Sequence, residues 1–436
     1  MQSTRLPTDV VLVMVFPLPA AIILGAVLLI GCAGSGPPSP DLSPDSAIIV
    51  VPGYYGSRLS QASDHELVWI SLGEALTGTR SLVLPHEGLG IQDGLVLRPD
   101  GILNGVTVIP YLYTVDAYGP LLNRLRNEFA QRTLIVPLAY DWRLDLAETV
   151  RALSETVDLL HQRGISRIVV LAHSMGGLVT AYYLRYGMQD PDSAVESWSG
   201  STKLSGAILT GVPYHGSMAT FRNMQYGRTV GLNDTLLSSE AVASFPASYY
   251  VLPSPQHDLL VSSSLQPFVG RLYQPDAWRD NEWGLFRNSE ALSDTTRDNR
   301  MLFTARWLTR ARQFFERLHA PSGTRPNPAV PLLSVKGRGT PTLAKGLWIQ
   351  GQEGPSPNVL FDHAHLQQRT TLDRAVLLED GDGTVTMTSG SLPEGYRSAL
   401  RSRELQLEME HGDLVSDSNA LDQMASFIES VLNTGN

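Results

Sequence analysis

The residues best suited to do chemistry lie in the stretch 168–177, which carries one serine, Ser174. An aliphatic run is followed by a tight turn of small residues and by the start of a helix. This pattern is typical of a nucleophile elbow, in which a strained strand-to-helix turn exposes the serine hydroxyl. Ala172 stands where glycine is commoner, and one methyl group is tolerable there. The N–H of Met175, the residue after the serine, is expected to bind the oxyanion that forms when the hydroxyl attacks an acyl carbonyl.

A serine hydroxyl is a poor nucleophile near neutral pH, so it needs a histidine to take its proton and a carboxylate to hold that histidine's tautomer. In chains with such an elbow, the acid and then the base follow the serine. Asp382 is the predicted acid, because its flanking glycines let the carboxylate turn back beneath the sheet edge. Asp380 is the alternative, since a Gly-Asp-Gly turn could equally be solvated surface.

Of the ten histidines, only His411 lies downstream of this acid. It follows a strand-like segment, 404–409, and precedes the last helical segment, which is the loop position that a triad base needs. His173 adjoins the serine and is expected to point into the scaffold. His363 and His365 could mimic a metal clip, but two imidazoles in an irregular stretch are more often plain surface, so no metal is predicted.

Short aliphatic runs alternate with segments of helical period, which predicts an α/β fold with a mostly parallel central sheet and helices on both faces. Strands are expected at 47–51, 133–138, 168–171, 206–210 and 331–335, and helices around 121–129, 150–160 and 421–431. We divide the chain into a core, 47–213 and 329–436, an excursion within it at 60–105, and an inserted cap at 214–328.

The N-terminus is predicted to be an export segment. Residues 1–31 contain a long apolar run behind a weakly basic start, as in a signal peptide. Leu29-Ile30-Gly31-Cys32 resembles the bacterial lipobox, in which the peptide is cut before the cysteine and Cys32 carries the acyl chains. The alternative is an uncleaved single transmembrane anchor. Residues 32–46, rich in Pro, Gly and Ser, are expected to be an extended tether, so the protein is predicted to be exported and anchored in the cell envelope.

Composition excludes several function classes. The chain has 436 residues, 43% of them hydrophobic, which is typical of a globular protein. Its formal net charge of −10, without a dense Lys/Arg stripe, argues against a nucleic-acid partner. The single cysteine excludes intrachain disulfides and cysteine-based metal sites. No P-loop, dinucleotide fingerprint or zinc helix is found, so no cofactor is expected, and no protein partner is predicted.

Six blocks in order resemble the lecithin:cholesterol acyltransferase family, which includes phospholipid:diacylglycerol acyltransferases, lysosomal phospholipases and many bacterial relatives. The blocks are Val50–Ser57, Ala139–Arg143, Ala172–Gly177, Thr210–Ser217, Gly337–Thr342 and Gly381–Val385. The resemblance implies an α/β-hydrolase fold and a triad of Ser174, Asp382 and His411. It also implies an oxyanion hole made by the backbone N–H groups of Met175 and Tyr54.

The family also places a membrane-touching excursion after the first strand and a cap over the site. The candidates for the membrane contact are Trp69, Ile70, Leu72, Leu82, Val83 and Leu84, with a buried satellite cluster as the alternative. The disulfide-closed loops of secreted animal members have no counterpart here, so their lid geometry cannot be transferred. No substrate-binding residues are predicted.

The function expected from the sequence is that of a membrane-associated serine O-acyltransferase or lipid acyl hydrolase. It would act on glycerolipid or phospholipid esters through an acyl-serine intermediate, with lipid and a membrane surface as its partners. The alternatives are a general carboxylesterase or triacylglycerol lipase without transferase activity, and a non-catalytic lipid-binding lipoprotein.

Overall fold

The computed structural model describes residues 44–91, 94–104, 118–257, 259–268, 271–287, 291–349, 358–362, 366 and 372–433. Its centre is a six-stranded sheet of β1 (Ser46–Val51), β5 (Thr133–Pro137), β6 (Arg167–His173), β7 (Gly206–Thr210), β11 (Pro331–Arg338) and β16 (Arg401–Glu408). The spatial order is β16-β11-β7-β6-β1-β5, and each neighbouring pair is parallel. The predicted α/β class with a mostly parallel sheet is therefore confirmed.

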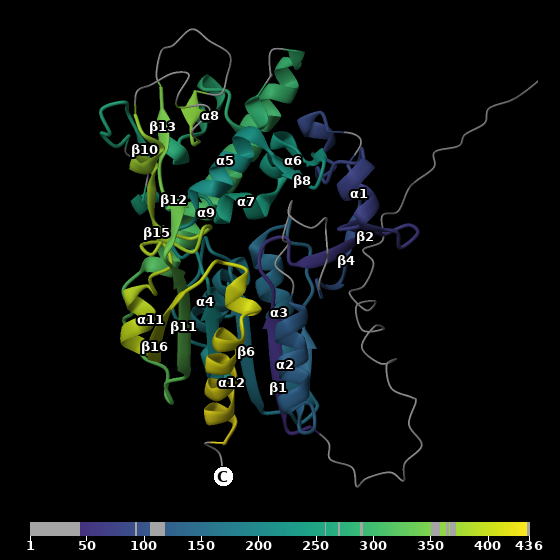
Figure 1. Ribbon diagram of the computed structural model, residues 1–436, viewed down its shortest axis with the longest axis vertical. Coiled ribbons are helices and arrows are strands. Elements are labelled where there is room, and N and C mark those ends of the chain that lie inside the picture. Colours follow the sequence, from purple (N-terminus) through teal and green to yellow (C-terminus); the bar gives the residue numbers. More distant parts are fainter. Residues whose placement is uncertain are drawn as a thin grey trace, which may run out of the picture. The chain divides into compact units, whose positions relative to one another are not determined.

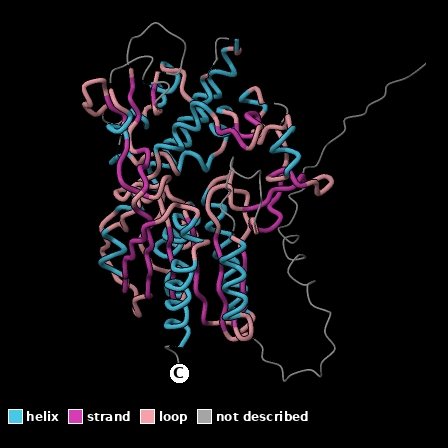
Figure 2. Tube along the Cα trace, in the orientation of Figure 1, coloured by secondary structure: helices cyan, strands magenta, loops and turns pink. Residues whose placement is uncertain are grey.

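Helices cover both faces of this sheet (Figures 1 and 2). They are α2 (Gly119–Phe129), α3 (Leu146–Gln162), α4 (Met175–Tyr186) and α12 (Ser418–Asn433). The side chains of β1 alternate between two hydrophobic clusters, as the period of a strand requires. Ile49 and Val51 pack in the cluster that contains α3 and α4, whereas Ile48 and Val50 pack in the cluster that contains α2 and α12.

The order of the strands reverses at one point of the sheet. The chain passes from β1 outward to β5 and then returns to β6 on the other side of β1. At such a switch point the connections leave in opposite directions, and open α/β sheets typically bind ligands there, at the carboxyl ends of the two central strands. Ser174 follows β6 and Pro52 follows β1, and both therefore lie at this switch point.

The excursion after β1 forms a small antiparallel sheet in the order β3-β2-β4. Its elements are β2 (Ser57–Gln61), β3 (Leu67–Trp69), α1 (Leu72–Thr77), η2 (Glu87–Leu89) and β4 (Leu97–Ile102). Trp69, Ile70, Leu82 and Val83 are buried in the main hydrophobic cluster. The expectation that these four side chains touch a membrane is wrong, because the alternative, a buried cluster, is what the excursion builds.

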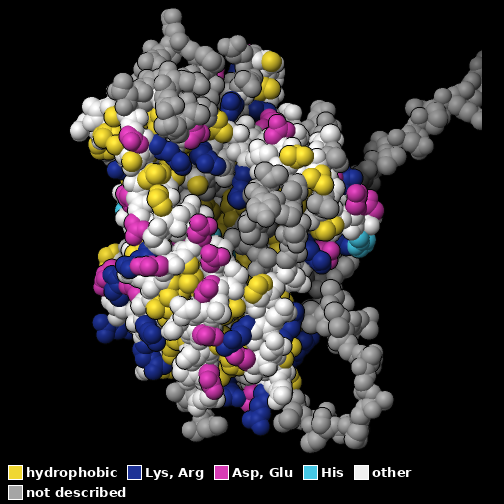
Figure 3. All heavy atoms as spheres, in the orientation of Figure 1, with side chains coloured by type: hydrophobic (Ala, Val, Ile, Leu, Met, Phe, Trp, Pro, Cys, Tyr) yellow, Lys and Arg dark blue, Asp and Glu magenta, His cyan; other side chains and the backbone are white. Residues whose placement is uncertain are grey.

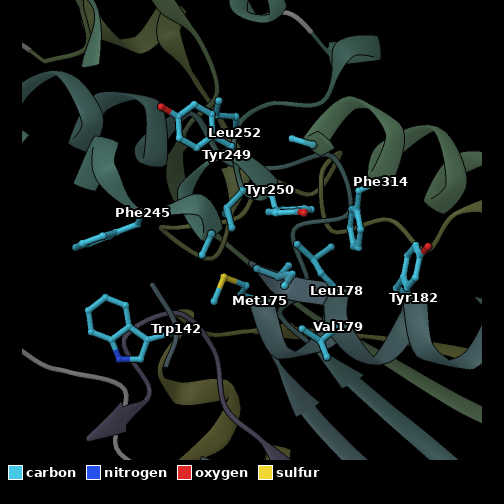
Figure 4. Packing of buried hydrophobic residues seen from close by; sticks show 14 of the residues in the cluster. Trp142, Met175, Leu178, Val179, Tyr182, Phe245, Tyr249, Tyr250, Leu252 and Phe314 are labelled. Carbon is cyan, nitrogen blue, oxygen red and sulfur yellow. The ribbon is translucent and has the colours of Figure 1, made fainter. Parts of the chain in front are cut away.

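The predicted cap region folds into short helices and strands at one end of the sheet (Figure 1). They are α5 (Met218–Tyr226), β8 (Arg228–Val230), β9 (Asn233–Leu237), α6 (Ser239–Ser244), α7 (Pro246–Tyr250), η4 (Pro255–His257), β10 (Leu260–Val261), η5 (Arg271–Tyr273), α8 (Pro275–Asp280), η6 (Gly284–Phe286) and α9 (Asp294–His319). Tyr249, Tyr250 and Phe314 pack above the start of α4 (Figure 4), in the same cluster as Met175 and Leu178. The cap and the core thus share one hydrophobic cluster, and the boundaries at 214 and 328 stay a prediction.

The last part of the chain carries two further small strand groups. Its elements are β12 (Thr340–Leu343), β13 (Gly346–Trp348), β14 (Val359–Leu360), η8 (Arg374–Leu377), β15 (Leu378–Gly381), α11 (Glu394–Ala399) and η9 (Asp413–Val415). β12 pairs antiparallel with β15, and β10, β13 and β14 form a three-stranded sheet. The β12–β15 pair ends at Gly381 and so delivers Asp382 to the sheet edge.

Acidic and basic side chains are interspersed over the face shown in Figure 3. Many of them form exposed ion pairs, such as those of Arg124 with Glu128 and Asp422. Exposed pairs of this kind contribute about 0–1 kcal/mol each, so the buried apolar clusters dominate the stability of the fold.

Some predictions fall outside the described residues. These are the export segment, the tether through residue 43 with Cys32, and the pair His363 and His365. Among the helices in the described part of the chain, none is long and apolar enough to span a bilayer.

Candidate active site

Ser174 occupies a strained turn between β6 and α4. Its φ of 54° and ψ of −125° lie in a region that non-glycine residues rarely adopt, at a cost of about 1–3 kcal/mol. The turn is held on both sides: the Ser174 N–H donates to the Thr210 carbonyl at 2.8 Å, and the Ser174 carbonyl accepts from the Gly177 N–H at 2.8 Å. The strand-to-helix geometry of a nucleophile elbow is therefore present around this serine.

The small residues around Ser174 are required by the end of β1. A Cβ atom on Gly176 would lie 2.4 Å from the Pro52 carbonyl oxygen, and one on Gly53 would lie 2.7 Å from the Ser174 Cβ. These distances are far below van der Waals contact, so the turn after β6 is pressed directly against the turn after β1. Any side chain at either position would separate the two turns.

Asp382 is buried, with 2% of its surface exposed. Its Oδ2 accepts from His411 Nδ1 at 2.8 Å, and its Oδ1 accepts from the N–H groups of Thr384 at 2.9 Å and Val385 at 2.7 Å. Burial alone would raise its pKa, but the His411 charge and hydrogen bond, with the two backbone N–H groups, outweigh burial and lower the pKa of Asp382. The carboxylate is thus ionised and fully hydrogen-bonded.

Asp380, the alternative acid, is exposed and faces away from this arrangement. Its Oδ1 accepts from the Gly339 N–H at 2.7 Å, and its backbone pairs with Pro341 in the β12–β15 ladder. His411 pairs with Asp382 and not with Asp380, so the structure favours Asp382 between the two candidates.

His411 lies on the loop between β16 and α12, with 7% of its surface exposed. Its backbone N–H donates to the Asp382 carbonyl at 2.9 Å, so its main chain and its ring both bond to the acid. A Cβ on Gly211 would lie 3.0 Å from His411 Cε1. The Ser174 N–H bonds to Thr210, the last residue of β7, and Gly211 is the next residue. The imidazole and the serine therefore both lie at the carboxyl end of β7.

A buried chain of hydrogen bonds joins the turn after β1 to the histidine loop. The Gly53 N–H donates to the Tyr118 hydroxyl at 2.7 Å, and this hydroxyl bonds to His173 Nδ1 at 2.9 Å. His173 Nε2 lies 3.3 Å from the His411 carbonyl oxygen. Since a carbonyl only accepts, Nε2 of His173 carries the proton and Nδ1 accepts from the tyrosine. His173 therefore points into the scaffold, and sequence reasoning missed Tyr118.

Two backbone N–H groups close to Ser174, in the turn after β1 and at the start of α4, are the predicted oxyanion donors. Gly56 N–H donates to the Gly53 carbonyl at 3.0 Å and closes a turn in which Tyr55 has a φ of 68°. The N–H of Tyr54, second in this turn, is not used by the closing bond. Met175 is the first residue of α4, and its N–H has no intrahelical acceptor. These are the two donors that the sequence suggested for an oxyanion hole.

The segment 139–143 braces the turn that holds Tyr54. The Tyr140 hydroxyl donates to the Pro52 carbonyl at 2.8 Å, and the Trp142 Nε1 donates to the Ser57 carbonyl at 3.0 Å. On the other side, Tyr54 OH and Ser248 Oγ of α7 are 2.7 Å apart. The aromatic block that resembles the family motif therefore holds the turn of Tyr54, the predicted oxyanion donor, between the core and the cap.

A stacked pair of histidines, His215 and His319, with the ring of His257 tilted beside it, joins the cap to the loop of Asp382. The His215 ring lies 4.0 Å from the ring of His319, at the end of α9, and 3.9 Å from that of His257. Burial, and then the neighbouring rings, lower the pKa of His215 to about 3; burial also lowers the pKa of His319 to about 4. Beside them, Ser389 Oγ donates to the Gly216 carbonyl at 2.6 Å. The stack is uncharged at neutral pH.

Comparison with known proteins finds a family match over part of the chain. Residues 85–282 match the family model of lecithin:cholesterol acyltransferase, which confirms the resemblance inferred from the motifs. The matched residues include Ser174 but end before Asp382 and His411.

Similar proteins share part of the chain or its fold. The uncharacterized protein YJR098C of Saccharomyces cerevisiae is 25% identical over 240 residues, which are 53% of this chain and 33% of that protein. The chain thus spans about a third of the length of this curated relative. The crystal structure of the Tle4–Tli4 complex aligns with a TM-score of 0.52 at 13% identity, over 90% of this chain and 99% of that one. A mature Bacillus licheniformis lipase, BlEst2, aligns over 90% of this chain and 96% of that one, at 10% identity and a TM-score of 0.34.

The fold is that of the α/β-hydrolases. Together with the family match, it supports a hydrolase or acyltransferase of lipid esters in general terms.

The two candidate acids predict a sharp contrast between two variants. Asp382→Asn keeps the size of the side chain but offers an amide N–H to His411 Nδ1, which favours the wrong tautomer. We expect kcat for a p-nitrophenyl ester to fall about 10⁴-fold, with the circular dichroism spectrum unchanged. Asp380→Asn should retain kcat within about twofold. Equal losses in the two variants would contradict the assignment of the acid.

The histidine stack predicts how stability depends on pH. Unfolded histidine titrates near pH 6.5, whereas His215 and His319 titrate at about 3 and about 4 in the fold. Below pH 6.5 the unfolded chain binds protons that the folded chain refuses, so the free energy of unfolding should fall as the pH drops from 6.5 to 4. His319→Gln should flatten this slope by up to about 1.4 kcal/mol per pH unit, measured by urea unfolding at pH 4.5, 5.5 and 6.5. An unchanged slope would rule out the stack as its source.

Proposed function

We propose that this protein is a serine acyl hydrolase or O-acyltransferase of the lecithin:cholesterol acyltransferase type. It acts on glycerolipid or phospholipid esters, and Ser174, Asp382 and His411 form its triad. The observation that carries the proposal is the buried pair of the Asp382 carboxylate and the His411 imidazole, 2.8 Å apart, at the same end of the sheet as the strained Ser174.

The reaction proceeds through two acyl transfers. Ser174 Oγ attacks the ester carbonyl carbon while His411 Nε2 takes the hydroxyl proton, and the N–H groups of Tyr54 and Met175 stabilise the oxyanion. The intermediate collapses, the protonated imidazole gives its proton to the leaving alcohol, and an acyl-serine remains. Water or a second alcohol then loses its proton to His411 and attacks the acyl-serine, which releases a fatty acid or a new ester.

The apolar side chains around Met175 suit a long acyl chain better than a short one. Met175 is packed among aromatic side chains of the core and the cap, including Trp142, Phe245 and Tyr250 (Figure 4). Each methylene group buried among such side chains contributes about 0.8 kcal/mol, so chain length is the property that this environment can select. Whether water or an alcohol resolves the acyl-serine depends on how well the cap excludes water.

We also propose that the protein is anchored to a membrane of the cell envelope through Cys32, which would carry lipid after cleavage of residues 1–31. The lipobox-like segment and the tether that follows it support this proposal. An uncleaved transmembrane anchor is the alternative. Either anchor would hold the enzyme at a lipid surface and raise the effective concentration of its substrate.

Labelling with a fluorophosphonate tests the proposed nucleophile. The parent protein should be labelled, and Ser174→Ala should lose labelling and ester hydrolysis, because only an activated serine reacts with this probe. Ser398→Ala, an exposed serine on α11, is the matched control and should be labelled like the parent. A folded parent that is never labelled would favour the non-catalytic lipid-binding protein.

The same preparation separates hydrolase from transferase. Phosphatidylcholine vesicles are supplied with and without a sterol or a diacylglycerol, and the products are measured by mass spectrometry. A new sterol ester or triacylglycerol is the expected result. Release of free fatty acid alone would reduce the proposal to a carboxylesterase or lipase.

A substitution at the cysteine tests the anchor. Cys32→Ala should move the protein from the membrane fraction to the soluble fraction and abolish the mass increment of an acylated, diacylglycerol-modified cysteine at the new N-terminus, because no thiol remains to be lipidated. Intact-mass spectrometry of the detergent-extracted protein measures this. A parent that retains residues 1–31 would support the transmembrane anchor instead.

A further inference from the structure

A cavity lies apart from the candidate active site, between the excursion after β1 and helix α9. Its volume is about 430 Å³, within the range of about 300–1,000 Å³ that is typical of small-molecule sites. None of the triad or oxyanion residues lines it. Most of its wall is apolar, and includes Leu89, Leu95, Leu97, Phe303 and Trp307.

Two of the charged groups in the wall neutralise each other. Arg143 donates to both carboxylate oxygens of Asp141, from Nε at 3.0 Å and from an Nη at 2.7 Å. Their side chains are only 2% and 6% exposed. This buried pair therefore adds no net charge to the cavity, and its hydrogen-bonding groups are already occupied.

Arg306 is the remaining cation in the wall. Its guanidinium lies 5.1 Å from the centre of the Trp307 ring, and no carboxylate in the described part of the chain lies within ion-pair distance of it. The side chain is exposed, so it stands where the cavity meets solvent. In a chain of net charge −10, an unpaired cation at the mouth of an apolar cavity is complementary to an amphiphile with an anionic head.

We propose that this cavity binds a long-chain fatty acid, with the acyl chain against the apolar wall and the carboxylate on Arg306. A planar guanidinium suits a carboxylate because it can donate two parallel hydrogen bonds. An unbranched chain gains about 0.8 kcal/mol for each methylene that it buries. The ligand is of the class that the proposed function would release, but the site is argued from its own geometry and is separate from Ser174.

The cavity and the oxyanion turn share one segment of chain. Along residues 140–143, Asp141 and Arg143 face the cavity, whereas Tyr140 and Trp142 bond to the turn that carries Tyr54. Arg143 also donates to the carbonyls of Leu82 at 3.2 Å and Leu95 at 3.4 Å. A fatty acid in the cavity would thus lie against the segment that fixes the turn of Tyr54, away from Ser174, which does not line the cavity.

Photolabelling of the full-length protein locates the site. A palmitate analogue with a diazirine near its terminal methyl is irradiated with the protein, and the labelled peptides are mapped by mass spectrometry. We expect labels within residues 84–97 and 303–307. Palmitate should compete with the probe, and hexadecanol should compete at least tenfold less well, because it lacks the charge that Arg306 pairs with.

Matched variants test the two parts of the site. Arg306→Ala should weaken palmitate binding about tenfold, whereas Arg312→Ala, an exposed arginine on the same helix, should not. Val96, which is 69% exposed, lines the cavity, so Val96→Trp should block entry and remove the label. Val195→Trp, at a position 70% exposed outside the cavity, should leave the label unchanged.

Three outcomes would overturn the proposal. They are labels confined to the peptide around Ser174, equal competition by hexadecanol, and no saturable labelling. Since the readout is binding and not turnover, the result does not depend on whether Ser174 reacts with a fluorophosphonate. Failure of this proposal and failure of the proposed function are therefore distinguishable.

Discussion

The contact between the turn after β6 and the turn after β1 is the constraint on which the site depends. Ser174 keeps an unfavourable backbone conformation, and such strain persists only where the surroundings over-determine it. The surroundings here are the Pro52 carbonyl against Gly176 and the Thr210 carbonyl on the Ser174 N–H. The same contact places the turn that carries Tyr54 against the turn of Ser174 and Met175, so the strain at Ser174 and the positions of the two proposed oxyanion donors have one structural origin.

The buried bonds from Gly53 through Tyr118 and His173 to the His411 carbonyl extend this constraint to the base. They connect three loops that lie far apart in the sequence. Each polar atom in this series of hydrogen bonds has a partner, so the loops are fixed relative to one another without a charge being buried. The charged part of the site is confined to Asp382 and its partners, where three hydrogen bonds hold the carboxylate and a fourth, from the His411 N–H, holds the Asp382 backbone carbonyl.

The elements that carry this site follow from local sequence patterns. The strand 47–51, the strand 168–171 and the terminal helix around 421–431 are recognisable because aliphatic periodicity is a local property, and the structure has them as β1, β6 and α12. The elbow around Ser174 is equally local, since it is a run of small residues between a strand and a helix. The excursion, by contrast, could not be predicted in detail, because β2, β3 and β4 are defined by their pairing with one another and not by a local pattern.

Long-range side-chain bonds left no such signal. Tyr118 and Tyr140 bond to partners 55 to 88 residues away. The sequence does not distinguish a tyrosine that hydrogen-bonds to a distant turn from one that only packs in a core. The flanking glycines predicted Asp382 as the acid, but Asp380 also lies beside Gly381 and therefore stayed the alternative. The register of β15 on β12, which places Asp380 within the ladder and ends at Gly381, favours Asp382.

The histidine stack shows how the cap depends on the same region. His319 ends α9, whereas His215 belongs to the segment after β7 that also bonds to the acid loop through Ser389. The cap helix and the loop of Asp382 therefore meet through uncharged imidazole rings, where an ion pair would have to be desolvated. Neutral rings can stack at 4.0 Å only while they remain unprotonated, since charging two of them would set like charges together in a buried site. The contact between the cap helix and the loop of Asp382 therefore requires a pH above the range in which these rings take up protons.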